Sequence, residues 1–331
     1  MYKKIALAAI LALLATYFFG PKPNRPTYTA YTSAVTELNG AALANYIDST
    51  EKLLPVKPNN EAKIIWANDS SKQKTKYAIV YLPGFSASRE EGAPTHTNIA
   101  KQFGCNIYLA RLAEHGLISD EPLLNLTAEA YWKSAVEALH IGEQLGDSVI
   151  LMSTSTGGTF ALLLCGNETL NKKIAANILL SPNVEIYDGK AGLLNNHWGL
   201  QTARLVMGGN YILSSDQRAE YKKYWYSKYR IEGAVAVQEL IETGMNNTLF
   251  EKITQPTLLM YYYKNEEEQD KVVKVSAMKN MFEKIKTPTN LKVQAAIAGA
   301  GDHVIGGYLK SKDLLSVNNE IVRFLKKQKG M

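Results

Sequence analysis

Cysteine is scarce in this sequence. Cys105 and Cys165 are the only two among 331 residues, and the five histidines are scattered. Neither residue type shows the spacing of a metal site, so we expect no metal cofactor. The two cysteines could pair in an exported protein, but their positions in the sequence do not predict contact, and buried free thiols are the expected state.

Internal repeats, low-complexity segments and basic clusters are also missing. Hydrophobic residues make up 46% and charged residues 21%, which is typical of a globular chain with a sizeable core. The formal net charge of +6 is spread along the chain. The stretch 221–230 (YKKYWYSKYR) combines basic and aromatic residues, and we interpret it as an amphipathic surface helix. We therefore expect no nucleic-acid partner.

The N-terminus has the layout of a secretory signal. Residues 1–4 are short and basic, and residues 5–19 follow without a charge. That run is short for a membrane span, which needs about 20 apolar residues. It lacks a clean A-x-A cleavage site, and no cysteine follows it to carry a lipid. We predict either a signal peptide or a signal anchor at 1–20, with membrane association through 5–19, and a catalytic domain that is periplasmic or membrane-anchored outside the cytoplasm.

A linker and N-terminal helical segment are predicted at 21–61, with a helix over 28–54. Beyond it, apolar β-branched runs alternate with amphipathic stretches. The predicted strands are 62–67, 77–82, 105–112, 148–153, 175–180, 257–263 and 291–297. The predicted helices are 92–103, 127–145, 156–165, 272–285 and 314–327. This alternation predicts an α/β fold whose mainly parallel central sheet is covered by helices on both faces.

The connection between Pro182 and Pro256 breaks this alternation, because it shows several helical patterns and no clear strand. A structureless loop of that length is implausible in a compact domain. We predict a helical cap at about 183–255. We expect about half of its aromatic residues to line an apolar pocket and the others to pack the cap onto the core. They are Trp198, Tyr211, Tyr221, Tyr224, Trp225, Tyr226 and Tyr229.

The segment 149–160 (VILMSTSTGGTF) leaves a strand through four hydroxyl residues and two glycines. Strand, tight turn and helix form the context of a nucleophile elbow, which needs small residues two positions before and after the nucleophile. Ser153 and Gly157 meet that need and centre the motif on Ser155. The N–H of Thr156, at the helix N-terminus, then faces the reacting carbonyl oxygen. The alternative is that these hydroxyls only cap the helix.

A serine nucleophile needs a base, and the base needs an acid that orients it. In this type of fold both follow the serine, the acid first. Only His303, in AGAGDHVIGG, lies in a loop after the last predicted strand. The acid belongs in the loop after TLLMYYY, where we favour Asp270 because an apolar pair follows it. Residues 266–268 look like solvated charges, and Asp302 is adjacent to His303 and poorly placed to contact it.

The second half of an oxyanion hole is expected in the loop LPGFS (82–86). Gly84 lets the backbone turn there, so that the N–H of Phe85 joins the N–H of Thr156. Two such donors stabilise developing negative charge, each typically by a few kcal/mol.

Together these segments resemble the α/β-hydrolase superfamily over nearly all of 63–327. The matching pieces are YLPGF, STSTG, DKVV and GDHVI. RLAEHGL (111–117) is similar to the Gly-His-Gly loop of monoglyceride-lipase-like and serine-aminopeptidase-like members. Pro83 stands where that family commonly has histidine before the oxyanion glycine, and Ser153 stands for the first glycine of the elbow. The acid loop is a couple of residues longer than is usual in the family. The resemblance implies an α/β-hydrolase fold over 62–331 with a helical cap inserted after strand 6 in the superfamily's numbering, which is the predicted strand 175–180 here.

The activity that the resemblance implies is that of a serine hydrolase, a carboxylesterase or lipase-like enzyme without a cofactor. Ser155, His303 and Asp270 are its expected triad, with the N–H groups of Phe85 and Thr156 as the oxyanion hole. The expected substrate is a small-molecule acyl ester or a lipid-like ester. Two alternatives remain: a peptidase, thioesterase or acyltransferase with the same triad, and a non-catalytic binding protein of this fold at the cell envelope.

Overall fold

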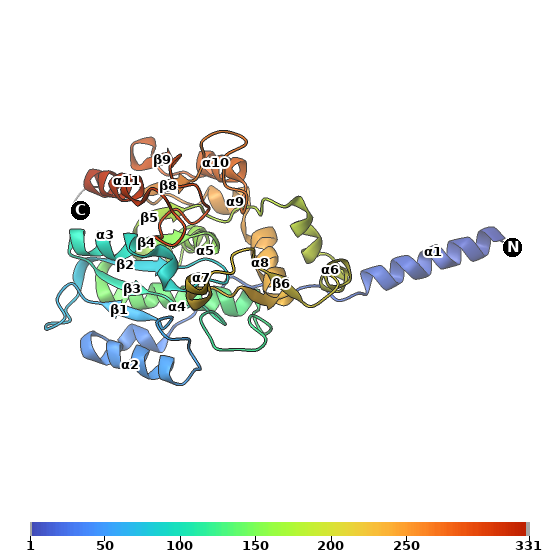
Figure 1. Cartoon of the computed structure of the whole chain (residues 1–331), viewed down its shortest axis with the longest axis horizontal. Coiled ribbons are helices and arrows are strands. Elements are labelled where there is room, and N and C mark those ends of the chain that lie inside the picture. Colours follow the sequence, from blue (N-terminus) through green and yellow to red (C-terminus); the bar gives the residue numbers. More distant parts are fainter. Residues whose placement is uncertain (1, 329–331) are drawn as a thin grey trace.

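The computed structural model describes residues 2–328. Its central element is a seven-stranded sheet (Figure 1). The strand order is β1-β3-β2-β4-β5-β8-β9, and every neighbouring pair is parallel except β1 and β3. The strands are β1 (Lys63–Ile65), β2 (Thr75–Leu82), β3 (Asn106–Leu109), β4 (Gly146–Thr154), β5 (Ile174–Leu180), β8 (Thr257–Tyr261) and β9 (Lys292–Ala296). Parallel neighbours require crossover connections, and here helices supply most of them.

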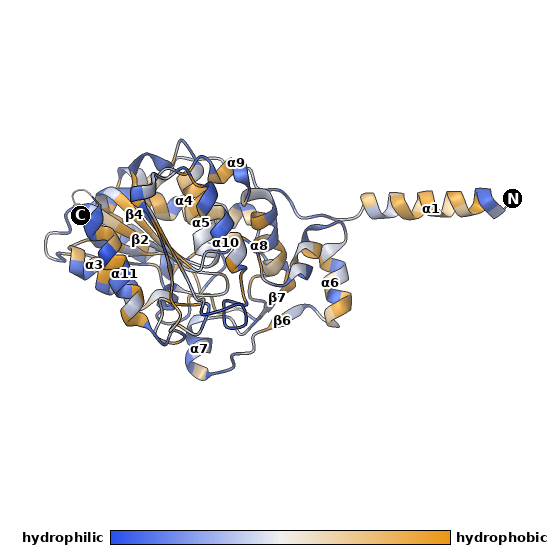
Figure 2. Ribbon diagram, turned by 90° about the horizontal axis from the view of Figure 1, so that it is seen from above, coloured by the Kyte–Doolittle hydropathy of each residue, from blue (hydrophilic) through white to orange (hydrophobic). Residues whose placement is uncertain are grey.

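Helices cover both faces of this sheet (Figures 1 and 2). Alternate side chains of β2 face opposite cores: Val80 and Leu82 enter one apolar cluster, and Ile79 and Tyr81 enter the other. The first cluster is closed by α4 (Ala128–Leu145), α5 (Thr156–Gly166), α8 (Ile231–Gly244) and α10 (Val275–Lys284). The second is closed by α3 (Thr95–Phe103) and α11 (Leu314–Lys327). The fold class predicted from the sequence is therefore confirmed. The predicted strands and crossover helices differ from the observed ones mainly at their ends.

The predicted helix over 28–54 is wrong in its first part. Residues 28–33 have no regular structure, and only η1 (Ala34–Glu37) and α2 (Gly40–Lys52) are helical. The hydroxyl of Tyr28 donates to the carbonyl oxygen of Leu240, and the hydroxyl of Tyr31 donates to that of Lys133. These contacts hold the segment 28–33 against α8 and α4, so tertiary packing overrides the local helix preference.

The cap lies between β5 and β8. Its helices are η4 (Gly189–Asn195), α6 (Gly199–Met207), α7 (Ala219–Tyr224), α8 and α9 (Asn247–Phe250). It also contains two short antiparallel strands, β6 (Tyr211–Leu213) and β7 (Lys228–Arg230), which the sequence did not predict. Three residues are too few to show an alternating pattern. Three further short helices lie outside the cap, η2 (Arg89–Gly92), η3 (Asn171–Lys173) and η5 (Thr289–Leu291).

The helix α1 (Tyr2–Phe18) projects away from the body, is apolar along most of its length and has no buried residue (Figures 1 and 2). Its C-terminal end contacts the cap, where the indole N–H of Trp198 donates to the carbonyl oxygen of Thr16. Within residues 2–328, no helix has both the length and the hydropathy that crossing a membrane requires. Cys105 and Cys165 are buried and unpaired.

Candidate active site

Ser155 occupies the turn between β4 and α5. Its backbone angles, φ 53° and ψ −121°, lie in a region that residues other than glycine rarely adopt. Three backbone hydrogen bonds hold this conformation. Ser155 donates its N–H to the carbonyl oxygen of Leu180, and its own carbonyl oxygen accepts from the N–H groups of Gly158 and Asn183. The strained turn is thus held in place by the strand and loop beside it.

The other hydroxyls of the turn are engaged in hydrogen bonds. Ser153 donates to the carbonyl oxygen of Ile178 over 3.3 Å, and the hydroxyls of Thr154 and Tyr81 share a bond of 3.0 Å. The hydroxyl of Thr156 accepts from the side-chain amide of Asn183 at 3.5 Å. The Ser155 hydroxyl has no such partner among residues 2–328 and lines a cavity of about 560 Å³.

Asp270 and His303 meet in the same cavity. Nδ1 of His303 donates to Oδ2 of Asp270 over 2.6 Å. The other carboxylate oxygen, Oδ1, accepts from the N–H groups of Val272 and Val273 at 2.8 and 3.1 Å, so the acid is fixed from both sides. The competing carboxylate, Asp302, instead accepts from the N–H of Val304.

The two partners stabilise one another's charged forms. Burial alone would raise the pKa of Asp270, but the His303 imidazole and the two backbone N–H groups outweigh it and hold that pKa below its usual value. Burial alone would lower the pKa of His303, but Asp270, followed by Glu91 and Asp302, raises it above its usual value. The imidazole is thereby prepared to accept a proton.

The remaining ring nitrogen of His303, Nε2, is buried and forms no hydrogen bond within residues 2–328. Ser155 and His303 therefore share a cavity without a direct hydrogen bond. In hydrolytic sites without substrate, this contact is often long and tightens only when substrate is bound.

The other histidines lie outside this arrangement. His140 pairs with Glu143, and His197 binds the carbonyl oxygen of Gly20. His96 contacts the carbonyl oxygen of Arg89, and burial lowers its pKa to about 4. His115 is buried behind the oxyanion loop, which is the segment 82–86 between β2 and η2.

Phe85 and Thr156 both line the cavity. Neither backbone N–H has an acceptor within residues 2–328. A third group, Glu91, was not predicted. Its buried carboxylate lines the cavity and accepts from the N–H of Gly84 at 2.5 Å. The sequence gives no signal for it, because Glu90 and Glu91 read as an ordinary solvated pair.

The cap supplies an aromatic wall to the cavity. Tyr221, Trp225 and Tyr229 line it, and the rings of Tyr221 and Trp225 stack at 4.9 Å with an interplanar angle of 9°. These are three of the seven aromatic residues named in the cap. The basic aromatic stretch 221–230 thus turns several of its rings inward. Asp216 and Lys310 add a charged pair to the lining, with 3.1 Å between Lys310 Nζ and Asp216 Oδ2.

The cap is also joined to the oxyanion loop and the residues just after it. Ser88 donates its N–H to the carbonyl oxygen of Tyr224, and Tyr226 donates its N–H to that of Ser86. Between these bonds, Ala87 and Trp225 pair as an isolated β-bridge. Among residues 2–328, no cluster of histidine, cysteine or acidic side chains has the geometry of a metal site.

No protein-family model matches the sequence, and no curated protein matches it. Solved structures match its fold. One, from a report on the metagenome-derived lipolytic enzymes LipS and LipT, has a TM-score of 0.64 at 16% identity and covers 82% of this chain and 99% of that chain. Est1E from Butyrivibrio proteoclasticus, solved with ferulic acid bound, has a TM-score of 0.55 at 16% identity and covers 82% and 96%.

A thermophilic esterase from Thermogutta terrifontis has a TM-score of 0.52 at 15% identity and covers 83% of this chain and 97% of its own. At such identities the likeness concerns the fold. The chain has the α/β-hydrolase fold, as its sequence predicted.

Proposed function

We propose that this protein is a serine hydrolase that cleaves acyl esters through an acyl-enzyme. The observation that carries the proposal is the Asp270–His303 pair, with Nε2 free, in one cavity with Ser155 at a strained strand-to-helix turn. Strain at such a position needs a reason, and exposure of a nucleophile is the usual one.

In the proposed mechanism, Ser155 Oγ attacks the ester carbonyl while Nε2 of His303 takes its proton. The new C–O bond gives a tetrahedral intermediate, whose negative oxygen accepts from the N–H groups of Phe85 and Thr156. His303 then gives the proton to the leaving alcohol, and the ester C–O bond breaks. Water attacks the acyl group in the same way and restores the Ser155 hydroxyl, while Asp270 orients the imidazole throughout.

The lining of the cavity supports the proposed substrate class. Phe85, Tyr229 and Val237 form an apolar wall suited to an acyl chain, and the solved structures of similar fold include named esterases and lipolytic enzymes. Asp216 and Lys310 add a polar part to the same lining. We therefore favour small acyl esters or lipid-like esters over peptides, thioesters and acyl transfer, which the same triad would also serve.

The test is labelling with a fluorophosphonate probe. We expect the full-length protein to be labelled, the Ser155→Ala variant not to be, and Ser153→Ala, the matched control two residues away, to be labelled normally. A series of p-nitrophenyl esters then gives the preferred acyl length. Absence of labelling in the folded parent would favour the non-catalytic binding protein. Labelling that survives Ser155→Ala would mean that another hydroxyl is the nucleophile.

We further propose that the N-terminal segment exports the chain, as a signal peptide or as a signal anchor. Support comes from the charge-free run 5–19 and from α1, which buries none of its side chains against the body. Fusion of 1–26 to alkaline phosphatase tests export. An inactive fusion in the cytoplasm would contradict it.

A further inference from the structure

The oxyanion loop presents three successive backbone N–H groups, and buried side chains take the outer two. Gly84 donates to Oε2 of Glu91 at 2.5 Å. Ser86 donates to Nε2 of His115 at 3.0 Å. The N–H of Phe85 lies between them and has no acceptor within residues 2–328. The loop is therefore held at both ends, and its middle donor is left free beside the cavity.

Glu91 holds the Gly84 side. It belongs to η2 and is only 2% exposed. A Cβ added to Gly84 would lie 2.8 Å from Oε1 of Glu91 and 3.0 Å from Cβ of Ser155, so Gly84 has both the carboxylate and the proposed nucleophile next to it. The hydroxyl of Tyr81 also donates to Oε2 of Glu91, at 3.3 Å. A larger side chain at position 84 would have to displace this carboxylate.

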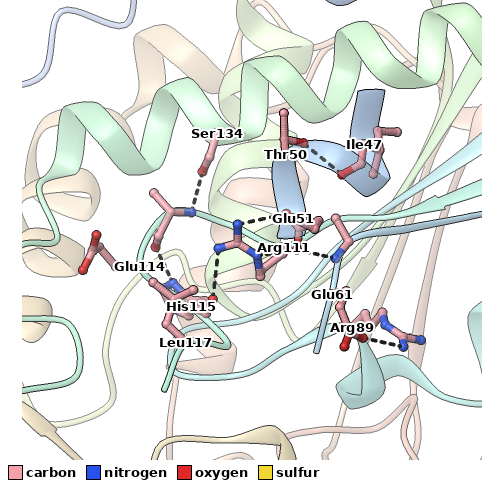
Figure 3. Close-up of polar contacts among 12 residues, drawn as sticks. Ile47, Thr50, Glu51, Glu61, Arg89, Arg111, Glu114, His115, Leu117 and Ser134 are labelled. Atoms are coloured by element: carbon pink, nitrogen blue, oxygen red, sulfur yellow. Dashed lines mark hydrogen bonds and ion pairs between the residues drawn. The ribbon is translucent and has the colours of Figure 1, made fainter. Parts of the chain in front are cut away.

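His115 holds the Ser86 side. Its Nδ1 lies 2.7 Å from the carbonyl oxygen of Ala113, which only accepts, so Nδ1 carries the proton and Nε2 is the acceptor. Tyr131 donates its hydroxyl to the same Nε2 and stacks on the ring at 4.8 Å. Figure 3 shows how the loop behind it is fixed: Arg111 donates to the carbonyl oxygen of His115 and, through two nitrogens, to Glu51.

We propose that Glu91 and His115 are positioning residues that hold the N–H of Phe85 in place as an oxyanion donor. Each accepts from a neighbouring N–H, so that this N–H does not compete with the N–H of Phe85 for the substrate oxygen. Each also fixes one of the two peptide planes that flank the Gly84–Phe85 peptide. This inference rests on the proposed hydrolase function and deepens it. Precise placement of such a donor matters, because removing one typically costs about 10²–10³-fold in kcat and a misplacement of about 1 Å costs about 10²-fold.

The two holders differ in their response to pH. Burial lowers the pKa of His115 to about 4, so this ring stays neutral and accepting at neutral pH. Burial raises the pKa of Glu91 to about 7, against the opposing effects of the Gly84 N–H, His303 and Tyr81 and with the help of Asp302. Tyr131 and Tyr221 are the other titratable groups that interact electrostatically with it. The Gly84 side of the loop therefore changes charge in the neutral range, and the Ser86 side does not.

The test compares full-length variants by ester hydrolysis and by the rate of fluorophosphonate labelling. Glu91→Leu and His115→Phe remove the acceptor, whereas Glu91→Gln and His115→Gln keep a carbonyl oxygen near its place. We expect Glu91→Leu and His115→Phe to lower kcat about 100-fold with KM changed less than about 3-fold. We expect Glu91→Gln and His115→Gln to recover at least about 10-fold of that loss. We also expect the acid limb of the kcat profile to be steeper in the parent than in Glu91→Gln, since only the parent titrates at both His303 and Glu91.

Glu239→Gln is the control, because Glu239 is equally buried at 2% exposed but lies outside the cavity. It should leave kcat and the pH profile unchanged. A labelled parent whose four variants keep its kcat would overturn the positioning role and leave the hydrolase proposal intact. An unlabelled parent would overturn both. If Glu91→Leu and His115→Phe do not fold, equal kcat and equal pH profiles in the parent, Glu91→Gln and His115→Gln would still overturn the inference.

Discussion

Gly157 lies so close to Leu82 that a Cβ on Gly157 would stand 2.0 Å from the carbonyl oxygen of Leu82. That oxygen belongs to β2, in the centre of the sheet, and has no freedom to retreat. We predict that Gly157→Ala destabilises the protein by about 2 kcal/mol or more and displaces the elbow, so that labelling of Ser155 slows. Gly189→Ala is the control, because nothing lies within 4 Å of its added Cβ. Thermal unfolding gives the stability of both variants, and equal losses of stability in the two would contradict the packing argument.

Asp270→Asn is predicted to lower kcat by about 10³–10⁴-fold, because an amide no longer fixes the Nδ1–H tautomer of His303 or stabilises its charged form. Asp302→Asn is the matched comparison, since Asp302 adjoins His303 but contacts Val304 instead. We expect a change of less than about 10-fold there. Ester hydrolysis under saturating substrate decides the matter, and a greater loss in Asp302→Asn would reassign the acid.

The pH dependence of kcat/KM follows from the raised pKa of His303. Nε2 must be unprotonated to act as a base, so the rate falls as pH drops through a value above 6.5. In Asp270→Asn the carboxylate no longer stabilises the imidazolium, and the limb moves to lower pH. The measurement is best made in the Glu91→Gln background, which removes the second titrating carboxyl. A limb that stays at the same pH in both proteins would contradict this assignment.

Glu91→Gln is predicted to affect stability in a pH-dependent way. Glu91 has a pKa of about 7 in the folded chain, against about 4.5 when exposed, so between these values the folded state holds a proton that the unfolded state has lost. The parent therefore loses stability as pH rises from 4.5 to 7, by about 3 kcal/mol. Gln carries no charge and avoids this loss. Denaturant unfolding at pH 4.5 and 8 measures the difference, and a constant offset between the two proteins would refute it.

The Arg111–Glu51 pair is predicted to stabilise the loop that carries His115. Both side chains are nearly buried, at 9% and 11% exposed, and Arg111 makes two hydrogen bonds to Glu51. Glu51→Ala leaves a buried guanidinium unpaired and should cost about 3 kcal/mol or more. Asp48→Ala is the comparison, because Asp48 lies one helical turn before Glu51 and pairs with Lys52 at the exposed surface. It should lower the stability by less than about 1 kcal/mol. Similar losses in the two variants would show that burial does not distinguish these pairs.

Much of the arrangement could be predicted from the sequence because it depends on chain order. The strand-turn-helix pattern located Ser155. The loops at the carboxyl ends of the last strands left few candidates for the acid and the histidine, and the favoured pair, Asp270 and His303, is hydrogen-bonded in the structure. Parallel strands bring those loops to one edge of the sheet whatever the details of packing.

Glu91 could not be predicted, because nothing local distinguishes it from Glu90. It is buried where η2 packs against Gly307: a Cβ on Gly307 would stand 2.0 Å from the carbonyl oxygen of Glu91. That contact joins segments more than two hundred residues apart in the sequence. The non-helical structure of the segment 28–33 was missed for the same reason, since the partners of Tyr28 and Tyr31 lie on helices that come much later in the chain.

The hydrogen bonds from Ser88 to Tyr224 and from Tyr226 to Ser86 have a mechanical consequence. A cap that shifts to accommodate a bulky acyl group must either break these bonds or carry the oxyanion loop with it. If the cap carries the loop with it, an oversized substrate of the proposed hydrolase would displace the N–H of Phe85. Such a substrate would be penalised in the chemical step as well as in binding, and the cap would select substrates by turnover rather than by affinity alone.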